Sequence, residues 1–148
     1  MYSKILIATD GSELAGEAVE HGIRLAESVG ATVVIVTVTE AWSPLEMADD
    51  IQAGILDATK VYEDAAARSA KAILEEAANR AASTGVVSET RHVKDRKPAE
   101  GIMNTAELEE CGLIVMATHG RRGLQRVLLG SQTAEVIALS KRPVLVIR

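Results

Sequence analysis

Short apolar segments alternate with amphipathic segments along the whole chain, and this alternation restricts the folds open to it. The clearest apolar segments are nearly continuous and mostly rich in β-branched residues; they cover residues 5–8, 32–38, 113–117 and 143–147. Strands buried on both faces of a parallel sheet have this character, because helices cover both faces of such a sheet. A fifth segment of mixed polarity, residues 86–93, predicts a strand at an edge of the sheet.

The intervening stretches carry apolar or alanine residues at helical spacing. They predict helices over residues 12–29, 51–83, 98–110 and 131–140. Ser12 and Ser131 are suited to cap the first and last of these helices, and Gly30 is suited to end the first. The second helix is long enough that we expect a bend or a frayed start. Residues 40–50, which include Trp42 and Pro44, predict an irregular connection.

Strict alternation of strand and helix predicts an α/β fold, a parallel sheet with helices on both faces. The 148 residues suit a single doubly wound domain spanning 1–148, with a core that needs no disulfide or metal. No signal peptide and no apolar run of about 18 residues is present, so we expect a cytoplasmic protein without a membrane span.

Composition excludes several functional classes. Aromatic residues make up only 2% of the chain and the net charge is −5, which argues against nucleic-acid binding and against a general affinity for acidic lipid. Cys111 is the only cysteine, so neither an intramolecular disulfide nor a cysteine-cluster zinc site can form. Because Cys111 precedes a buried strand, we interpret it as a small core residue.

The chain segments that follow the predicted strands carry the candidate chemistry, because ligands of open parallel sheets bind at the carboxyl ends of the strands. Residues 8–12 follow the first strand, and Gly120 and Gly123 follow the fourth. Glycine permits positive φ and a close approach of ligand to backbone. Gly130-Ser131 then begins a helix, whose free N–H groups and dipole favour an anion. The alternative is that these glycines only form turns and Ser131 only caps its helix.

Asp10 likewise has two interpretations. Its carboxylate either accepts hydrogen bonds from a ribose or holds a metal through water, or it braces the turn that Ser12 caps. The phosphate loop with Gly-Lys-Ser/Thr and the Gly-x-Gly-x-x-Gly fingerprint of dinucleotide folds are both absent. His119 either approaches a phosphate or shapes the turn with Thr118. Arg121, Arg122 and Arg126 form a basic cluster that either screens phosphate charge, pairs with a partner, or is solvated.

The whole chain resembles the universal stress protein family, in particular its ATP-binding branch. The resemblance is carried by residues 4–12, 113–120, 130–131 and 142–147. ATP-binding members carry the motif Gly-x2-Gly-x9-Gly-Ser/Thr. Ala117, Gly120, Gly130 and Ser131 occupy the motif positions with the spacing intact, but Ala117 replaces the first glycine. The added methyl bears directly on whether the nucleotide is accommodated.

The resemblance implies a sheet of order 3-2-1-4-5, a homodimer formed by pairing of the last strands, and ATP accompanied by Mg²⁺ or Mn²⁺. It implies that Ala8, Thr9 and Asp10 line the adenosine side, with Val38 against adenine and Met116 and Ala117 as the floor. The residues it places around the phosphates are Gly120, Gly130, Ser131, Gln132 and Thr133. The strand at residues 144–147 is apolar enough to aggregate at a sheet edge unless it is paired, which favours the dimer independently.

Three functions are compatible with these features. The first is a nucleotide-binding regulatory protein of the stress response, slow or inert as an enzyme. The second is an ATP hydrolase or nucleotidyl transferase that uses the same pocket; it ranks lower because the sequence offers no clear general base and no phosphate-loop lysine. The third is a dimeric scaffold that binds no nucleotide, which the loss of the glycine at Ala117 favours and the retention of Gly120, Gly130 and Ser131 opposes.

Overall fold

The computed structural model describes residues 1–41, 43, 45, 58–121 and 129–148, in which strands and helices alternate from the first strand to the last. The strands are β1 (Lys4–Ala8), β2 (Thr32–Thr39), β3 (Ser88–Lys94), β4 (Leu113–Ala117) and β5 (Val144–Ile147). The helices are α1 (Glu13–Val29), α3 (Ala58–Ser83), α4 (Pro98–Leu108) and α5 (Ser131–Leu139). The predicted α/β class is confirmed.

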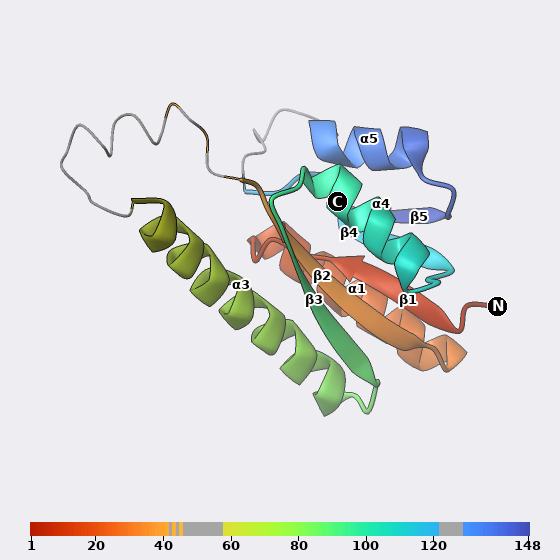
Figure 1. Cartoon of the computed structure of the whole chain (residues 1–148). Coiled ribbons are helices and arrows are strands. Elements are labelled where there is room, and N and C mark those ends of the chain that lie inside the picture. The colour runs from red at the N-terminus through yellow and green to blue at the C-terminus, as the bar shows by residue number, and fades with distance from the viewer. Residues whose placement is uncertain (42, 44, 46–57, 122–128) are drawn as a thin grey trace.

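The five strands form one parallel sheet of order β3-β2-β1-β4-β5, as predicted (Figure 1). Central strand β1 pairs with β2 through Ile7 and Ile35, and with β4 through Ile7 and Val115. The chain moves from β1 to β2 and β3 on one side and later returns as β4 on the other. The strand order therefore reverses between β1 and β4, which is where an open α/β sheet forms its ligand crevice.

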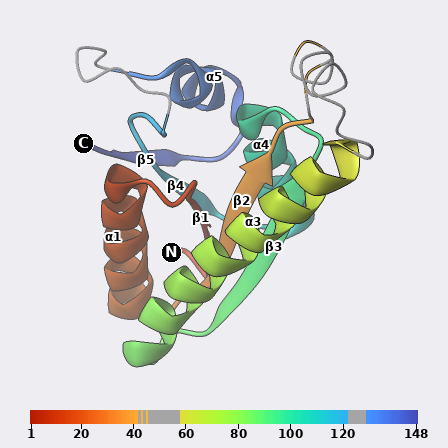
Figure 2. The ribbon, with the colours of Figure 1, turned by 90° about the vertical axis from the view of Figure 1, so that its left-hand side faces the viewer.

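Each face of the sheet packs against its own pair of helices (Figure 2). Ile5 and Ile7 point to the face covered by α1 and α3, whereas Leu6 and Ala8 point to the face covered by α4 and α5, because successive side chains of a strand alternate. A Cβ at Gly22 of α1 would lie 2.6 Å from Cδ1 of Ile7. Glycine at that position therefore allows α1 to pack closely on the central strand.

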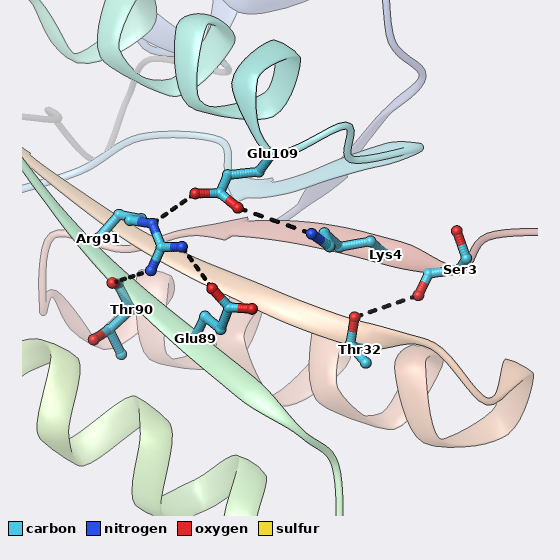
Figure 3. A network of polar contacts seen from close by, with 7 residues as sticks. All are labelled: Ser3, Lys4, Thr32, Glu89, Thr90, Arg91 and Glu109. Carbon is cyan, nitrogen blue, oxygen red and sulfur yellow. Dashed lines mark hydrogen bonds and ion pairs between the residues drawn. The ribbon is translucent and has the colours of Figure 1, made fainter.

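A network of partly exposed charges ties α4 to the sheet (Figure 3). The carboxylate of Glu109 accepts from Arg91 Nε at 2.6 Å and lies 3.8 Å from Lys4 Nζ, and Arg91 also pairs with Glu89 at 2.5 Å. The hydrogen bonds to Glu109 and Glu89 raise the pKa of Arg91. The contacts join β1, β3 and the C-cap residue of α4, and each contributes little stability because water screens it.

The predicted element boundaries differ from the observed ones in detail. Strand β3 begins two residues later than predicted, and Val86 is buried ahead of it. Val29, the last residue of α1, is 41% exposed and lies outside the buried face of that helix. Residues 51–57 of the predicted second helix, together with Trp42 and Pro44, lie outside the described residues. None of the described helices is long and apolar enough to cross a membrane.

Candidate functional site

A cavity of about 530 Å³ lies at the carboxyl ends of the strands, where the strand order reverses. Its volume falls within the range of small-molecule sites. Every residue that the family resemblance implied for the nucleotide contributes to its lining. These residues are Ala8, Thr9, Asp10, Val38, Met116, Ala117, Gly120, Gly130, Ser131, Gln132 and Thr133. The structure thus brings together segments from β1, β2, β4 and α5 that lie far apart in the sequence.

Helix α3 forms a further wall of the cavity, which sequence reasoning missed. Its contribution is a stripe of mostly small side chains: Tyr62, Ala65, Ala66, Ser69, Ala70 and Ile73. The Tyr62 hydroxyl donates to the carbonyl of Glu40 at 3.1 Å, which connects α3 to the end of β2. The helical spacing of these residues was visible in the sequence, but periodicity alone does not distinguish a face against a cavity from a face against a core.

The turn between β1 and α1 satisfies its own polar groups. Asp10 Oδ1 accepts from the N–H of Ser12 at 3.0 Å, and Ser12 Oγ accepts from the N–H of Ala15 at 3.3 Å. Ser12 therefore caps α1, as predicted. Gly11 has a φ of +78°, a conformation that side chains disfavour. The bracing role considered for Asp10 is present in the structure.

Asp10 also joins this turn to the loop after β4. Its Oδ2 accepts from the N–H of Arg121 at 2.6 Å. A Cβ at Gly120 would collide with the same carboxylate, so glycine there permits the close approach. Positive φ, the other property expected of Gly120, is not observed: the described glycines with positive φ are Gly11, Gly30 and Gly85. Gly123, Arg122 and Arg126 lie outside the described residues.

Gly130 and Thr133 anchor the start of α5 to the end of β4. The N–H of Gly130 donates to the carbonyl of Thr118 at 2.7 Å, and a Cβ on Gly130 would lie 3.2 Å from that oxygen. Thr133 Oγ1 donates to the carbonyl of Ala117 at 3.0 Å. The prediction that Ser131 caps the helix is wrong: Gly130 occupies the cap and Ser131 is the first helical residue. Because glycine has no side chain, the first N–H groups of α5 receive no acceptor from their own cap.

The N-terminus of α4 receives its cap from α5. Lys97 occupies the cap position but its side chain makes no capping hydrogen bond, and Pro98 has no N–H. The next donor, the N–H of Ala99, reaches Gln132 Oε1 at 2.9 Å. This long-range bond was not predicted, because a glutamine at the start of one helix carries no signal of the helix it will cap.

Few charges line the described part of the cavity. Arg121 brings a cation, and Asp10 and Glu40 bring carboxylates. His119 lines the cavity while its Nδ1 lies 3.2 Å from Thr118 Oγ1, the turn-shaping contact considered for it. In the described ranges, no group of three or more His, Cys, Asp or Glu side chains is arranged to hold a metal ion.

Two further residues have defined surroundings. Cys111 is fully buried in the core between the sheet, α4 and α5, and desolvation raises the pKa of its thiol to about 11, which agrees with the predicted core role. His92 of β3 is half-buried, and its Nε2 lies 2.9 Å from Thr39 Oγ1. Desolvation, followed by the charge of Lys94, lowers the pKa of His92.

The fold and cavity define a doubly wound α/β protein with a cavity of small-molecule size at its topological switch point. The family model of the universal stress protein family matches residues 1–148. The universal stress protein MJ0531 of Methanocaldococcus jannaschii is 35% identical over 150 residues, covering 100% of this chain and 83% of that protein. The chain belongs to the universal stress protein family.

Two solved structures share the fold at appreciable identity. Protein MJ0577 of Methanocaldococcus jannaschii aligns with a TM-score of 0.81 and 29% identity, covering 99% of this chain and 96% of that one. A universal stress protein crystallised in complex with cAMP aligns with a TM-score of 0.74 and 27% identity, covering 99% and 97%. The sheet order predicted from the family resemblance is thus both observed in this chain and consistent with known relatives.

Proposed function

We propose that this protein binds an adenine nucleotide, ATP in particular, in the cavity at the carboxyl ends of β1 and β4. The observation that carries the proposal is the convergence of every implied site residue on one cavity of about 530 Å³. The complex of a relative with cAMP supports the choice of an adenine nucleotide. Residues 1–148 act in this proposal as one universal stress protein domain.

The cavity offers different surroundings to the two ends of the ligand. Val38 and Met116 line it together with Ile102 of α4, and such an apolar wall suits a flat base. Gly120, Gly130 and Ser131 line the part formed by the loop after β4 and the start of α5. Backbone N–H groups and the helix dipole there suit phosphate oxygens. We assign the base to the first wall and the phosphates to the second.

Asp10 lines the cavity beside Gly120, with its Oδ2 next to the loop after β4. Each of its oxygens accepts one backbone N–H, and a carboxylate oxygen has capacity for a further hydrogen bond. A ribose hydroxyl or a metal-bound water is the donor that this proposal assigns to it. Because the described side chains form no metal cage, Mg²⁺ or Mn²⁺ would be held chiefly by phosphate oxygens, the usual arrangement for nucleotide-bound Mg²⁺.

The biological role that we propose is regulatory: the nucleotide-bound protein acts in the stress response of the cytoplasm.

Small molecules released from the purified, denatured protein can be identified by mass spectrometry, and the affinity for ATP can be measured by calorimetry with and without Mg²⁺. A co-purifying adenine nucleotide and saturable binding are expected. Absence of binding at millimolar ATP contradicts the proposal and favours the scaffold. Product analysis at saturating Mg²⁺ detects hydrolysis or nucleotidyl transfer, which would favour the enzyme.

We further propose a homodimer formed through β5. Strand β5 is the last strand of the sheet and pairs with β4 on one side. On its other side, no strand in the described part of the chain pairs with it. Leu145 of β5 is 37% exposed, and Ile137 and Leu139 of the neighbouring α5 are 47% and 62% exposed. An apolar edge strand next to exposed apolar side chains is protected when a second copy pairs with it antiparallel, giving a two-fold dimer.

Replacing Val146 with lysine tests the dimer. We expect a dimer for the parent protein in sedimentation experiments at micromolar concentration and a shift toward monomer for Val146→Lys, because the lysine would bring its charge into the apolar sheet face that the two paired strands share. Val87→Lys serves as a control, since Val87 is 67% exposed and lies just before β3, at the opposite edge of the sheet. A parent protein that is strictly monomeric contradicts the proposal.

A further inference from the structure

Gln132 connects two helices at the edge of the cavity. It is the second residue of α5 and lines the cavity, while its Oε1 accepts from the N–H of Ala99 in α4. Ala99 is fully buried, and Pro98 before it has no N–H. An unpaired buried N–H is costly, so the Gln132 oxygen is held at this position and is not free to turn toward a ligand.

This bond also fixes the orientation of the Gln132 amide. A backbone N–H can only donate, so the side-chain atom that faces Ala99 must be the oxygen and not the nitrogen. The two N–H donors of the amide nitrogen therefore face away from Ala99. Within the described residues, that nitrogen donates no hydrogen bond. The polar group that Gln132 can offer to the cavity is thus a donor.

We propose that Gln132 makes the site specific for phosphorylated ligands. Its amide nitrogen donates to a phosphate oxygen of the bound nucleotide, while its amide oxygen caps α4. This inference rests on the proposed nucleotide site and adds to it a side-chain donor with a fixed orientation. Gln132 lies between Ser131 and Thr133 at the start of α5, where the helix dipole also favours an anion. The Thr133 hydroxyl donates to Ala117, so its proton is already committed.

The substitution Gln132→Glu separates the two halves of this role. A carboxylate keeps an acceptor for the N–H of Ala99 and caps α4 at least as well, but it replaces the donor beside the phosphate with a negative charge. We expect ATP affinity to fall at least about tenfold and adenosine affinity to stay within about threefold of the parent. The melting temperature should not decrease. Calorimetry with ATP, AMP and adenosine, together with thermal unfolding, provides these measurements.

Two further variants control for charge and for structure. Ala72→Glu makes the same change in net charge on the exposed side of α3, away from the cavity lining, and should leave ATP affinity unchanged. Gln132→Met removes both the donor and the cap, so it should lower ATP affinity and melting temperature together. In nuclear magnetic resonance spectra, the side-chain amide signal of Gln132 should move on addition of ATP and move much less with adenosine.

The outcomes distinguish this inference from the proposed function. If the parent binds ATP and Gln132→Glu binds it within about threefold as tightly, the donor role is wrong and the nucleotide site stands. Equal losses of ATP and adenosine affinity in Gln132→Glu would also overturn the donor role, because they would indicate a general disturbance of the cavity. A parent that binds neither ATP nor AMP overturns the proposed function and this inference together.

Discussion

The N-termini of α1 and α5 lie at the same edge of the sheet but are built differently. Ser12 caps α1 with its side chain, and Glu13 places a negative charge in the first turn. Helix α5 has Gly130 at its cap, no side-chain capping bond and no acidic residue in its first turn. The protein itself thus supplies the N-terminus of α1 with a side-chain acceptor and a negative charge. The start of α5 lacks both, and this is the end suited to an external anion.

The N-terminus of α4 is an intermediate case. It too lacks a cap from its own segment, but Gln132 of α5 supplies the acceptor. Of these three helix starts beside the cavity, only α5 therefore has no side-chain acceptor among the described residues. The comparison predicts that changes at α5 alter nucleotide affinity, whereas the equivalent changes at α1 alter only stability.

The largest effect is expected for Gly130→Val. The added side chain would approach the Thr118 carbonyl, which is 3.2 Å from an ideal Cβ, and would crowd the backbone donors at the start of α5. Each charge-assisted hydrogen bond to phosphate contributes about 1.5–3 kcal/mol, so losing two lowers ATP affinity at least about a hundredfold. Calorimetric titration with ATP measures the change.

Gly130→Ala is a second, milder variant for this test, because the larger valine side chain also strains the loop. Its single methyl should produce a smaller loss of affinity in the same direction, with a smaller loss of thermal stability. Circular dichroism shows whether each variant remains folded. Two folded variants that bind ATP as the parent does would place the phosphates away from α5.

A smaller effect is expected for Ser131→Asp, which gives α5 the acidic first turn that α1 already has. The carboxylate interacts favourably with the helix dipole, by about 0.3–1 kcal/mol, so thermal stability should rise slightly. It also repels phosphate, so ATP affinity should fall about tenfold while adenosine affinity is retained. Ser131→Ala should change affinity less, because the backbone donors remain. Unchanged ATP binding by Ser131→Asp would contradict the proposed difference between the starts of α1 and α5.

Ser12→Ala is the matched change at α1. Loss of the cap should lower the free energy of unfolding by about 1 kcal/mol, measured by urea denaturation, with ATP affinity unchanged. Substitutions at the start of α5 should therefore change mainly ATP affinity, and the substitution at the start of α1 should change mainly stability. A loss of ATP affinity in Ser12→Ala as large as in Ser131→Asp would show that both helix starts contact the nucleotide.

The same contrast explains what the sequence could predict. Strands such as residues 113–117 and the cap at Ser12 were predictable, because hydrophobic runs and capping residues act over short distances. The hydrogen bonds from Ala99 to Gln132 and from Arg121 to Asp10 were not predictable, since they join residues that only the tertiary fold brings together. The misassigned cap at Ser131 has a local cause: glycine and serine are both accepted cap residues, and they are adjacent here.

The smallest effect is expected for Ala117→Gly, which restores the glycine of the family motif. Ala117 is the last residue of β4, is 7% exposed and lines the cavity, and its carbonyl already accepts from Thr133.

Removing one methyl leaves that hydrogen bond in place, so we expect ATP affinity to stay within about threefold of the parent. Stability should fall by about 0.5–1 kcal/mol, because glycine is less restricted in the unfolded chain. A gain in affinity above tenfold would instead show that the methyl obstructs the nucleotide. It would then be β4, and not the start of α5, that limits binding in this chain.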